Sequence, residues 1–348
     1  MSPTFARQVP AESDFRPDWP PAAQQRFFLN YAVLAPSSHN TQPWLFRVVG
    51  DTAELYADRN RALRVVDPDD RELVISCGAA LHHLRTAVRY FGHDDETGIA
   101  PDGHPDLLAT VRLGRPHSRD ESDDALFHAI PGRRTTRAAF RPDPVPDGVQ
   151  AELLQAAAAF GVWAFRVETP EDKHRVAELV AEGDHIQFRD EAFRRELAHW
   201  LRPNDTHSGD GLPGYTQGMG YVASYVGPWV VRTFDLGDGT AARDGQLAEG
   251  SPLLLVLGTA TDSREAWLAT GQALSNLLLV AHRHGLGVSY LNQPVEVPAL
   301  RPRLRRLTGD AGQPQLVLRL GYSAVTPPPT PRRPVEAVLQ TLHLPGPA

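Results

Sequence analysis

Several features that mark particular classes of protein are scarce in this sequence. Cys77 is the only cysteine among 348 residues, which excludes an internal disulfide framework and indicates a reducing compartment. No stretch approaches the roughly 18 uninterrupted apolar residues of a membrane-spanning helix, and the N-terminal residues lack the apolar segment of a signal peptide. The formal net charge of −7 argues against a nucleic-acid partner. We expect a cytoplasmic protein that binds neither membrane nor nucleic acid.

Familiar cofactor and catalytic motifs are also missing. There is no G-x-G-x-x-G after a strand, no G-x-x-x-x-G-K-[ST] loop and no G-x-S-x-G elbow, so neither a dinucleotide fold, a P-loop nor a serine hydrolase has support. The histidine pairs His82–His83 and His282/His284 have no carboxylate or cysteine at ligand spacing. We therefore predict no metal site.

The chain resembles itself in three places, in the same order in each half. The similar pairs are "QPWLFRVVG" (42–50) with "GVWAFRVET" (161–169), "CGAALHHLRTAVRYFG" (77–92) with "TGQALSNLLLVAHRHG" (270–285), and "LLATVRLG" (107–114) with "QLVLRLG" (315–321). Ordered internal similarity of this kind predicts two divergent copies of one structural unit.

Each copy shows the same pattern of expected elements. A strand with alternating W-x-F-x-V comes first, a helix with apolar residues at i, i+3, i+4 and i+7 follows, and a closing strand ends at Gly114 or Gly321. The helical stretch over 267–287 is apolar nearly all round, so we expect it to be central and buried. A glycine at 285 or 287 should end it. The unit is therefore α+β.

The copies differ in the span between the W-x-F strand and the long helix, which is much longer in the second copy. The extra material, roughly 183–250, begins with a helical pattern and becomes rich in glycine, proline and aspartate. Long inserts of this kind are usually functional or flexible. We predict a lid.

The polar loop "PSSHNTQPW" precedes the first W-x-F strand. Ser37, Ser38, Asn40 and Gln42 offer hydroxyl and amide groups that both donate and accept hydrogen bonds. Such groups suit a ligand edge with alternating donors and acceptors. A loop that caps a helix end is the alternative interpretation.

The second cluster is "IPGRRTTRAAF", residues 130–140. Arg133 and Arg137 are four residues apart, so on a helical turn they point the same way, with the Thr135 hydroxyl between them. A phosphate dianion needs convergent, charge-assisted donors of this kind. The alternative is a solvated basic turn.

Taken together, "PSSHNTQPWLF", "GRRTTRAAF" and "ALSNLLLVAHRHGLG" resemble the motifs of the FMN-dependent nitroreductase superfamily, over about residues 26–340. In most members two identical subunits build two flavin sites at their interface. Here the arginine motif occurs only in the second half and the full polar loop only in the first. That division is similar to the tandem branch that includes the mycobacterial Acg proteins, which fuse two copies, keep one flavin site and cover it with a lid.

The resemblance implies a nitroreductase-like α+β fold in which two tandem copies form an intramolecular pseudo-dimer. The chain itself would be a monomer or a homodimer. The implied divisions are an N-terminal extension (1–25), a first half (26–127), a second half (128–340) with the lid insertion at about 183–250, and a C-terminal tail (341–348).

The resemblance also implies which residues hold FMN. The second half would supply donors to the phosphate and to the ribityl or pyrimidine edge, the polar loop would reach the same flavin from the first half, and the loop "GLGVSYLNQP" would lie beside flavin N5. The residues concerned are Arg133, Thr135 and Arg137; Ser37, Ser38, Asn40 and Gln42; Leu291 and Asn292 near N5; and Arg332 and Arg333, which return to the phosphate. For the last two, an exposed tail is the alternative.

A flavin carries the hydride chemistry, while the protein supplies binding, orientation and electrostatics. The expected function is ping-pong hydride transfer from NAD(P)H to a nitroaromatic, a quinone or a similar acceptor. We assign no general acid. The alternatives are an FMN-sequestering protein with a closed lid and little reductase activity, and an FMN-dependent oxidase that tailors a specific metabolite. Lid opening separates the first alternative from an active reductase.

Overall fold

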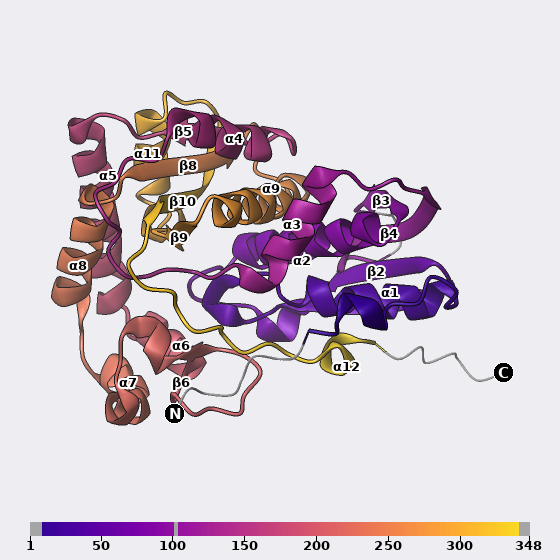
Figure 1. The fold of residues 1–348 in the computed structure, drawn as a ribbon. Helices are drawn as coiled ribbons and strands as arrows, with labels where there is room; N and C mark the ends of the chain where they lie inside the picture. Colours follow the sequence, from indigo (N-terminus) through magenta and orange to yellow (C-terminus); the bar gives the residue numbers. More distant parts are fainter. Residues whose placement is uncertain (1–8, 101–103, 341–348) are drawn as a thin grey trace.

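The computed structural model describes residues 9–100 and 104–340. Two antiparallel sheets lie side by side, with a helical segment flanking one of them (Figure 1). Within the described residues, no helix is both long and apolar enough to cross a bilayer.

The first half contains a four-stranded sheet with the order β1-β2-β4-β3. Its strands are β1 (Trp44–Val49), β2 (Thr52–Ala57), β3 (His93–Ile99) and β4 (Leu107–Pro116). A tight hairpin joins β1 and β2, pairing Val49 with Thr52. Gly50 in that turn has φ +59°, a conformation that glycine adopts without steric cost.

The second half contains a four-stranded sheet with the order β5-β8-β10-β9. Its strands are β5 (Trp163–Arg166), β8 (Leu253–Thr259), β9 (Leu286–Tyr290) and β10 (Gln313–Tyr322). In both sheets the first strand along the chain is at one edge and the third at the other, and the long helix follows the second strand. This shared topology supports the interpretation of two copies of one unit.

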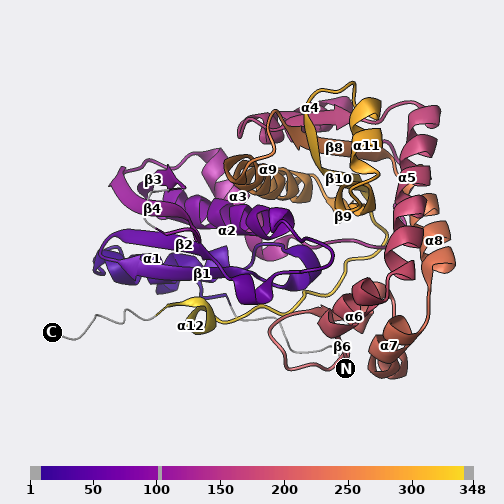
Figure 2. The same cartoon turned by 180° about the vertical axis from the view of Figure 1, so that it is seen from behind.

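The long helices α2 (Arg71–Tyr90) and α9 (Arg264–Arg283) pack against each other between the two sheets, as both views show (Figures 1 and 2). A Cβ at Gly78 would lie 2.2 Å from the Leu268 carbonyl oxygen, and one at Gly271 would lie 1.9 Å from the Ile75 carbonyl oxygen. Only glycine permits so close an approach. The two glycines occupy equivalent places in the repeated segments, so equivalent parts of the two halves meet here.

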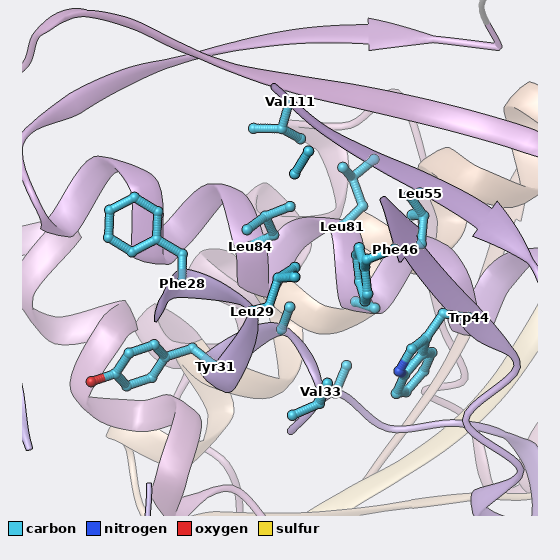
Figure 3. Close-up of a cluster of buried hydrophobic side chains, with 14 of the residues drawn as sticks. Phe28, Leu29, Tyr31, Val33, Trp44, Phe46, Leu55, Leu81, Leu84 and Val111 are labelled. Carbon is cyan, nitrogen blue, oxygen red and sulfur yellow. The ribbon is translucent and has the colours of Figure 1, made fainter. Parts of the chain in front are cut away.

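The first core surrounds the W-x-F strand. Trp44 and Phe46 of β1 are fully buried among side chains of α1, β2 and α2 (Figure 3). In the second half, alternate residues of β8 point to opposite faces of the sheet, as the pleat requires. Leu255 and Leu257 pack in the cluster around α9, while Leu254 and Val256 pack in the cluster that contains α5. Helices on both faces explain why this strand is uninterruptedly apolar.

Shorter helices and turns complete the two halves. They are α1 (Pro21–Ala32), α3 (Glu121–Gly132), α4 (Asp147–Ala158), α10 (Gln293–Glu296), α11 (Arg301–Leu307) and α12 (Val335–Val338), with 3-10 turns η1 (Glu12–Asp14), η2 (Ser38–Asn40) and η3 (Arg59–Arg61).

The long segment between β5 and β8 has two parts. Its elements are α5 (Pro170–Arg189), α6 (Glu191–Trp200), β6 (Leu201–Arg202), β7 (Leu212–Pro213), η4 (Gly214–Gln217), α7 (Tyr221–Thr233) and α8 (Gly237–Glu249). Helix α5, with Ala248 of α8, contributes to the core of the second sheet. Residues 190–236 form the middle of the predicted lid insertion (about 183–250), and we use the word lid for them from here on. With Phe188 they share a separate apolar cluster with Leu63 and Val66 of the first half.

After β10 the chain returns to the first half as an extended arm, the yellow segment in Figure 1. Val335 and Val338 join the first core, and the Gln340 N–H donates to the Phe46 carbonyl oxygen at 2.8 Å. The second half therefore extends across the first half and is anchored there.

We predict that Gly271→Ala lowers the free energy of unfolding by at least ~1–3 kcal/mol, because the added methyl group forces α2 and α9 apart. Urea denaturation followed by circular dichroism measures this. The control is Gly239→Ala in α8, where an added Cβ meets no atom within 4 Å. Equal free energies of unfolding for the Gly271→Ala variant and the parent protein would contradict the close contact.

Candidate functional site

Arginine side chains from two distant segments meet where the halves join. Arg133 and Arg134 follow the end of α3, Arg137 lies three residues after Arg134, and Arg332 is on the C-terminal arm. We call these four residues the arginine cluster. Burial lowers the pKa of Arg133, and the charge of Arg134 lowers it further. Arg133 is only 5% exposed, so this cation is held inside the protein.

Local backbone pairing fixes the arginine motif. After α3 the chain runs beside β9, where the Thr136 N–H donates to the Val288 carbonyl oxygen at 2.9 Å and Thr135 forms an isolated bridge with the same residue. Thr135 is half-buried in this position. The motif is thus an added edge segment of the second sheet, and not the helical turn that the four-residue spacing predicted.

Arg319 supports this segment from within β10. Its Nη2 donates to the carbonyl oxygens of Thr136 (3.1 Å) and Ala138 (3.0 Å), and its guanidinium lies 4.5 Å from the ring centroid of Phe140. Burial lowers the pKa of Arg319 to about 10. The sequence analysis missed this residue, although a lone charge within the apolar strand "LVLRLGY" is the signal that could have found it.

Arg332 is surrounded by neutral acceptors. Its Nη1 donates to Asn40 Oδ1 at 3.1 Å and its Nη2 to the Leu34 carbonyl oxygen at 3.2 Å, while its buried Nε has no partner. Burial, followed by the charges of Arg133 and Arg134, lowers the pKa of Arg332 to about 9. The C-terminal arm at Arg332 is therefore packed against the first half. It is not the exposed tail that was the alternative interpretation of Arg332 and Arg333.

Tyr290, the last residue of β9, has its hydroxyl among these arginines. Burial raises the pKa of Tyr290, while the charges of Arg133, Arg137 and Arg332 act in the opposite direction. The buried Tyr290 hydroxyl has no hydrogen-bond partner within the described residues. Sequence reasoning did not select this tyrosine, because nothing in its local pattern distinguishes it from a core residue.

The buried donors of the cluster have no acidic partner. Arg133 Nε and Nη1, Arg332 Nε and the Tyr290 hydroxyl are all unpaired, and among the described residues neither Arg133 nor Arg332 forms an ion pair. Burying an unpaired cation costs several kcal/mol. Several converging donors around a buried positive charge suit an anion with several acceptor oxygens, such as a phosphate group.

The polar loop runs past the cluster in a strained conformation. His39, Asn40 and Gln42 have φ values of 49°, 55° and 51°. Asn40 Nδ2 donates to the carbonyl oxygens of Gly211 and Pro331, both at 3.0 Å. These contacts tie the loop to the lid and to the arm together.

Gln42 also connects the polar loop with the lid and with the C-terminal arm. Its Nε2 donates to the Gly209 carbonyl oxygen at 2.8 Å, and its Oε1 accepts from the Arg333 N–H at 2.7 Å. Arg61 adds an ion pair with Asp210 of the lid. We call these contacts of Asn40, Gln42 and Arg61 the clasp. The structure thus places the amides of Asn40 and Gln42 in the clasp.

Arg333 has different partners from those of Arg332. Its Nη1 lies 3.6 Å from Asp58 Oδ2 and donates to the Gln42 carbonyl oxygen at 3.1 Å. Arg333 therefore has an acidic partner, which Arg332 lacks. Of these two neighbours on the arm, only Arg332 contributes an uncompensated charge to the cluster.

The two serines of the loop make different contacts, and only Ser38 contacts the start of α2. Ser37 Oγ accepts from the Gln42 N–H at 2.9 Å, and Ser38 Oγ donates to Glu72 Oε2 at 2.5 Å. Burial lowers the pKa of His39 to about 4, so this ring is neutral between Glu72 and Arg137. Glu72, which the sequence analysis did not select, is therefore the acid nearest to the loop.

Leu291 and Asn292 occupy different environments. The Leu291 N–H donates to the Val317 carbonyl oxygen at 2.9 Å, so this donor is used within the sheet. Asn292 Nδ2 donates to Glu72 Oε1 at 3.3 Å. The structure thus brings Asn292 next to Glu72 and Ser38, and places Leu291 in the core.

The pair His82–His83 lies inside the protein. His82 Nδ1 lies 3.0 Å from Ser275 Oγ, and His83 Nδ1 lies 3.3 Å from the Tyr31 carbonyl oxygen. Burial lowers the pKa of His82 to about 3 and also lowers the pKa of His83, so both rings are neutral. They belong to the interface between α2 and its neighbours.

Comparison with known proteins agrees with the motifs. The nitroreductase family model matches residues 130–322, from the arginine motif to the end of β10. The protein named "Putative NAD(P)H nitroreductase Rv3131" of Mycobacterium tuberculosis is 36% identical over 335 residues, or 92% of each chain. The protein named "Putative NAD(P)H nitroreductase acg" of the same organism is 30% identical over 88% of this chain and 92% of its own.

Among solved structures, the FMN-dependent nitroreductase NfnB from Mycobacterium smegmatis in complex with NADPH matches 63% of this chain and 99% of its own, at 18% identity and a TM-score of 0.42. The resemblance drawn from the motifs is confirmed by the sequence relatives, which align over most of the chain. This chain belongs to the nitroreductase family.

Proposed function

We propose that the protein is an FMN-dependent NAD(P)H oxidoreductase with one flavin site per chain. The observation that carries this proposal is the set of buried, unpaired donors on Arg133, Arg332 and Tyr290, which meet at the junction of the two halves. The names of the relatives, which describe NAD(P)H nitroreductases, support the same activity.

The donor set fits FMN in charge and in number. A phosphate dianion would neutralise Arg133 and Arg332, whose pKa values are lowered by burial without a counter-ion. Arg137 and Tyr290 would hold the rest of the molecule, and Thr135 and Ser38 have hydroxyls near this path. Bound FMN supplies hydride transfer, which no side chain of the protein can perform.

Other residues of the site hold these donors in place. Arg319 holds the arginine motif against β9 and β10, and the α2–α9 contact fixes the distance between the two halves. Such fixed donors need no reorganisation when charge develops on a bound molecule. NAD(P)H and then a nitroaromatic or quinone acceptor would bind in turn at the same place.

A second candidate function is FMN sequestration, and the clasp favours it. Asn40, Gln42 and Arg61 together hold lid residues 209–211 against the polar loop. A lid that stayed clasped would exclude nicotinamide while retaining the flavin. The two functions therefore differ in one measurable property, which is access to NADPH.

Anaerobic mixing of the FMN-loaded protein with NADPH tests the proposed function. Prompt loss of the oxidised flavin absorbance, followed by its return when a quinone is added, is the result expected of an oxidoreductase. A band that persists under NADPH would indicate sequestration. Failure to take up FMN at all would refute both functions.

We predict that the double variant Arg133→Ala/Arg137→Ala binds FMN at least ~100-fold more weakly, because each lost charge-assisted hydrogen bond costs about 1.5–3 kcal/mol. Quenching of flavin fluorescence on titration gives the dissociation constant. The matched control is Arg283→Ala, an exposed arginine at the end of α9. Unchanged affinity in the double variant would remove the arginine cluster from the site.

For the clasp, we predict that Asn40→Gly raises amide hydrogen exchange in residues 203–217 about tenfold, since three side-chain hydrogen bonds, one to the lid and two to the arm, are lost. Glycine keeps the positive φ of 55° without steric cost, so the loop itself is preserved. Asn60→Gly, exposed in η3, serves as the control. Equal exchange in the Asn40→Gly variant and the parent protein would show that the lid does not depend on this side chain.

A further inference from the structure

Two carboxyl groups from different halves meet beside the site. Glu72 is the second residue of α2 and is 3% exposed, while Glu296 ends α10 and hydrogen-bonds with Glu72 through its side chain. Neither residue belongs to the arginine cluster or to the clasp. Their position between the polar loop and a surface cavity raises the question of what they do.

The hydrogen bonds around the pair show which carboxyl group is ionised. Glu72 accepts from Ser38 Oγ (2.5 Å), Arg71 Nη2 (3.2 Å) and Asn292 Nδ2 (3.3 Å), a set of donors that favours the ionised carboxylate. Glu296 Oε2 accepts from Gln187 Nε2 at 2.6 Å. The other oxygen of Glu296 is therefore available to carry a proton toward Glu72.

Electrostatics give the same assignment. Burial, and then the negative charge of Glu72, raise the pKa of Glu296 well above its ordinary value, against smaller opposing effects of Gln187 and Arg71. Two carboxyl groups in contact do not both ionise near neutral pH. The contact with Glu72 therefore favours the protonated form of Glu296.

A cavity connects the pair with solvent. It has a volume of about 310 Å³, and its lining includes Glu296, Arg71 and Asp67, with the exposed residues Asp69 and Pro298 at its rim. Burial and the charge of Glu72 raise the pKa of Asp67 to about 7, so this acid exchanges protons in the neutral range. Its Oδ2 also accepts from the Leu73 N–H at 2.9 Å, which fixes it at the cavity wall.

We propose that Glu296 and Glu72 supply the proton that an acceptor takes up when it is reduced at this site. The inference rests on the proposed function. In the reduction of a quinone, the hydride provides both electrons and one hydrogen to the acceptor. The O–H bond of the carboxyl pair breaks, its proton forms a new O–H bond on the reduced acceptor, and the charge of the pair changes from −1 to −2 until the pair is reprotonated.

The pair then regains its proton from water in the cavity, past Asp67. Ser38, whose hydroxyl contacts Glu72 at 2.5 Å, lies on the side of the site and links the pair to it. Oxidation of NADPH during the first half of the cycle needs no proton from the pair. The two half-reactions should therefore respond differently when the pair is altered.

The decisive variant is Glu296→Gln. A glutamine keeps the size of the side chain and can donate a hydrogen bond to Glu72, as the protonated acid does, but it has no proton to release. The variant should fold like the parent protein. Glu249→Gln, which alters an exposed glutamate at the end of α8, is the matched control.

The first measurement is the infrared spectrum of the protein without cofactor. We expect the carbonyl stretch of a buried protonated carboxylic acid in the parent protein and in Glu249→Gln, and loss of one such component in Glu296→Gln. In the parent protein the same component should disappear as the pH is raised. A spectrum unchanged by Glu296→Gln would overturn the shared proton, whatever the FMN experiments show.

The second measurement is stopped-flow kinetics of the two half-reactions with NADPH and a quinone. We expect Glu296→Gln to leave flavin reduction by NADPH unchanged and to slow reoxidation by the quinone about 10- to 100-fold. In the parent protein, reoxidation should slow as the pH rises and the pair loses its proton, and the variant should lack this dependence. Unchanged reoxidation in a variant that has lost the infrared component would overturn the supply role. Failure of NADPH to reduce the parent protein would instead refute the proposed function.

Discussion

The contact between α2 and α9 is the constraint on which the site depends. Gly78 and Gly271 let two helix backbones approach to a distance that excludes any Cβ, and each helix is packed under the sheet of its own half. The loops at the ends of these helices are thereby held in fixed relation. The arginine motif of the second half, the polar loop and Glu72 of the first, and the returning C-terminal arm all meet at one end of this contact because the helix pair does not slide.

The junction is chemically asymmetric although the topology repeats. Both halves have the same strand order and the same central helix, but only the second carries the arginine motif and only the first carries the polar loop. A pair of identical subunits would present each element twice. In this chain one half supplies the cations and the other supplies the loop and the acid, so the observed donors converge at a single place. The corresponding place in the other half lacks an arginine motif, and this accounts for a single proposed flavin site.

Much of the fold could be predicted from the sequence because its strands and helices follow from the local spacing of apolar residues. The alternating W-x-F-x-V strands, the nearly all-apolar helix over 267–287 and the glycines near its end correspond to β1, β5 and α9. The arginine motif was also recognised, although its segment pairs with β9 and is not helical. That Asn40 and Gln42 bind FMN stays a prediction; in the structure their side chains bond with backbone groups of the lid and arm and, for Asn40, with the Arg332 guanidinium. Nothing local encodes such a partner.

The site residues that could not be predicted from the sequence also depend on partners far along the chain. Arg319, Tyr290, Glu72 and Glu296 each sit in an ordinary helix or strand, and their significance arises only from neighbours far along the chain. Arg319 becomes a support because β10 passes under the arginine motif, and the pKa of Glu296 is raised by burial and by the charge of Glu72, next to which α10 places it. Burial of a charged or polar side chain, which is a property of the folded chain, is the physical signal that identifies all four.

The central claim is that the junction recognises an anion once per chain, and equilibrium titration of the protein with FMN and with riboflavin tests it most directly. The two ligands share the ring system and the ribityl chain and differ in the phosphate group. We predict saturation at one FMN per chain and binding of riboflavin at least ~100-fold weaker, since the charge-assisted hydrogen bonds of the arginine cluster would be lost. Riboflavin binding as tight as that of FMN, or two FMN molecules per chain, would contradict the claim.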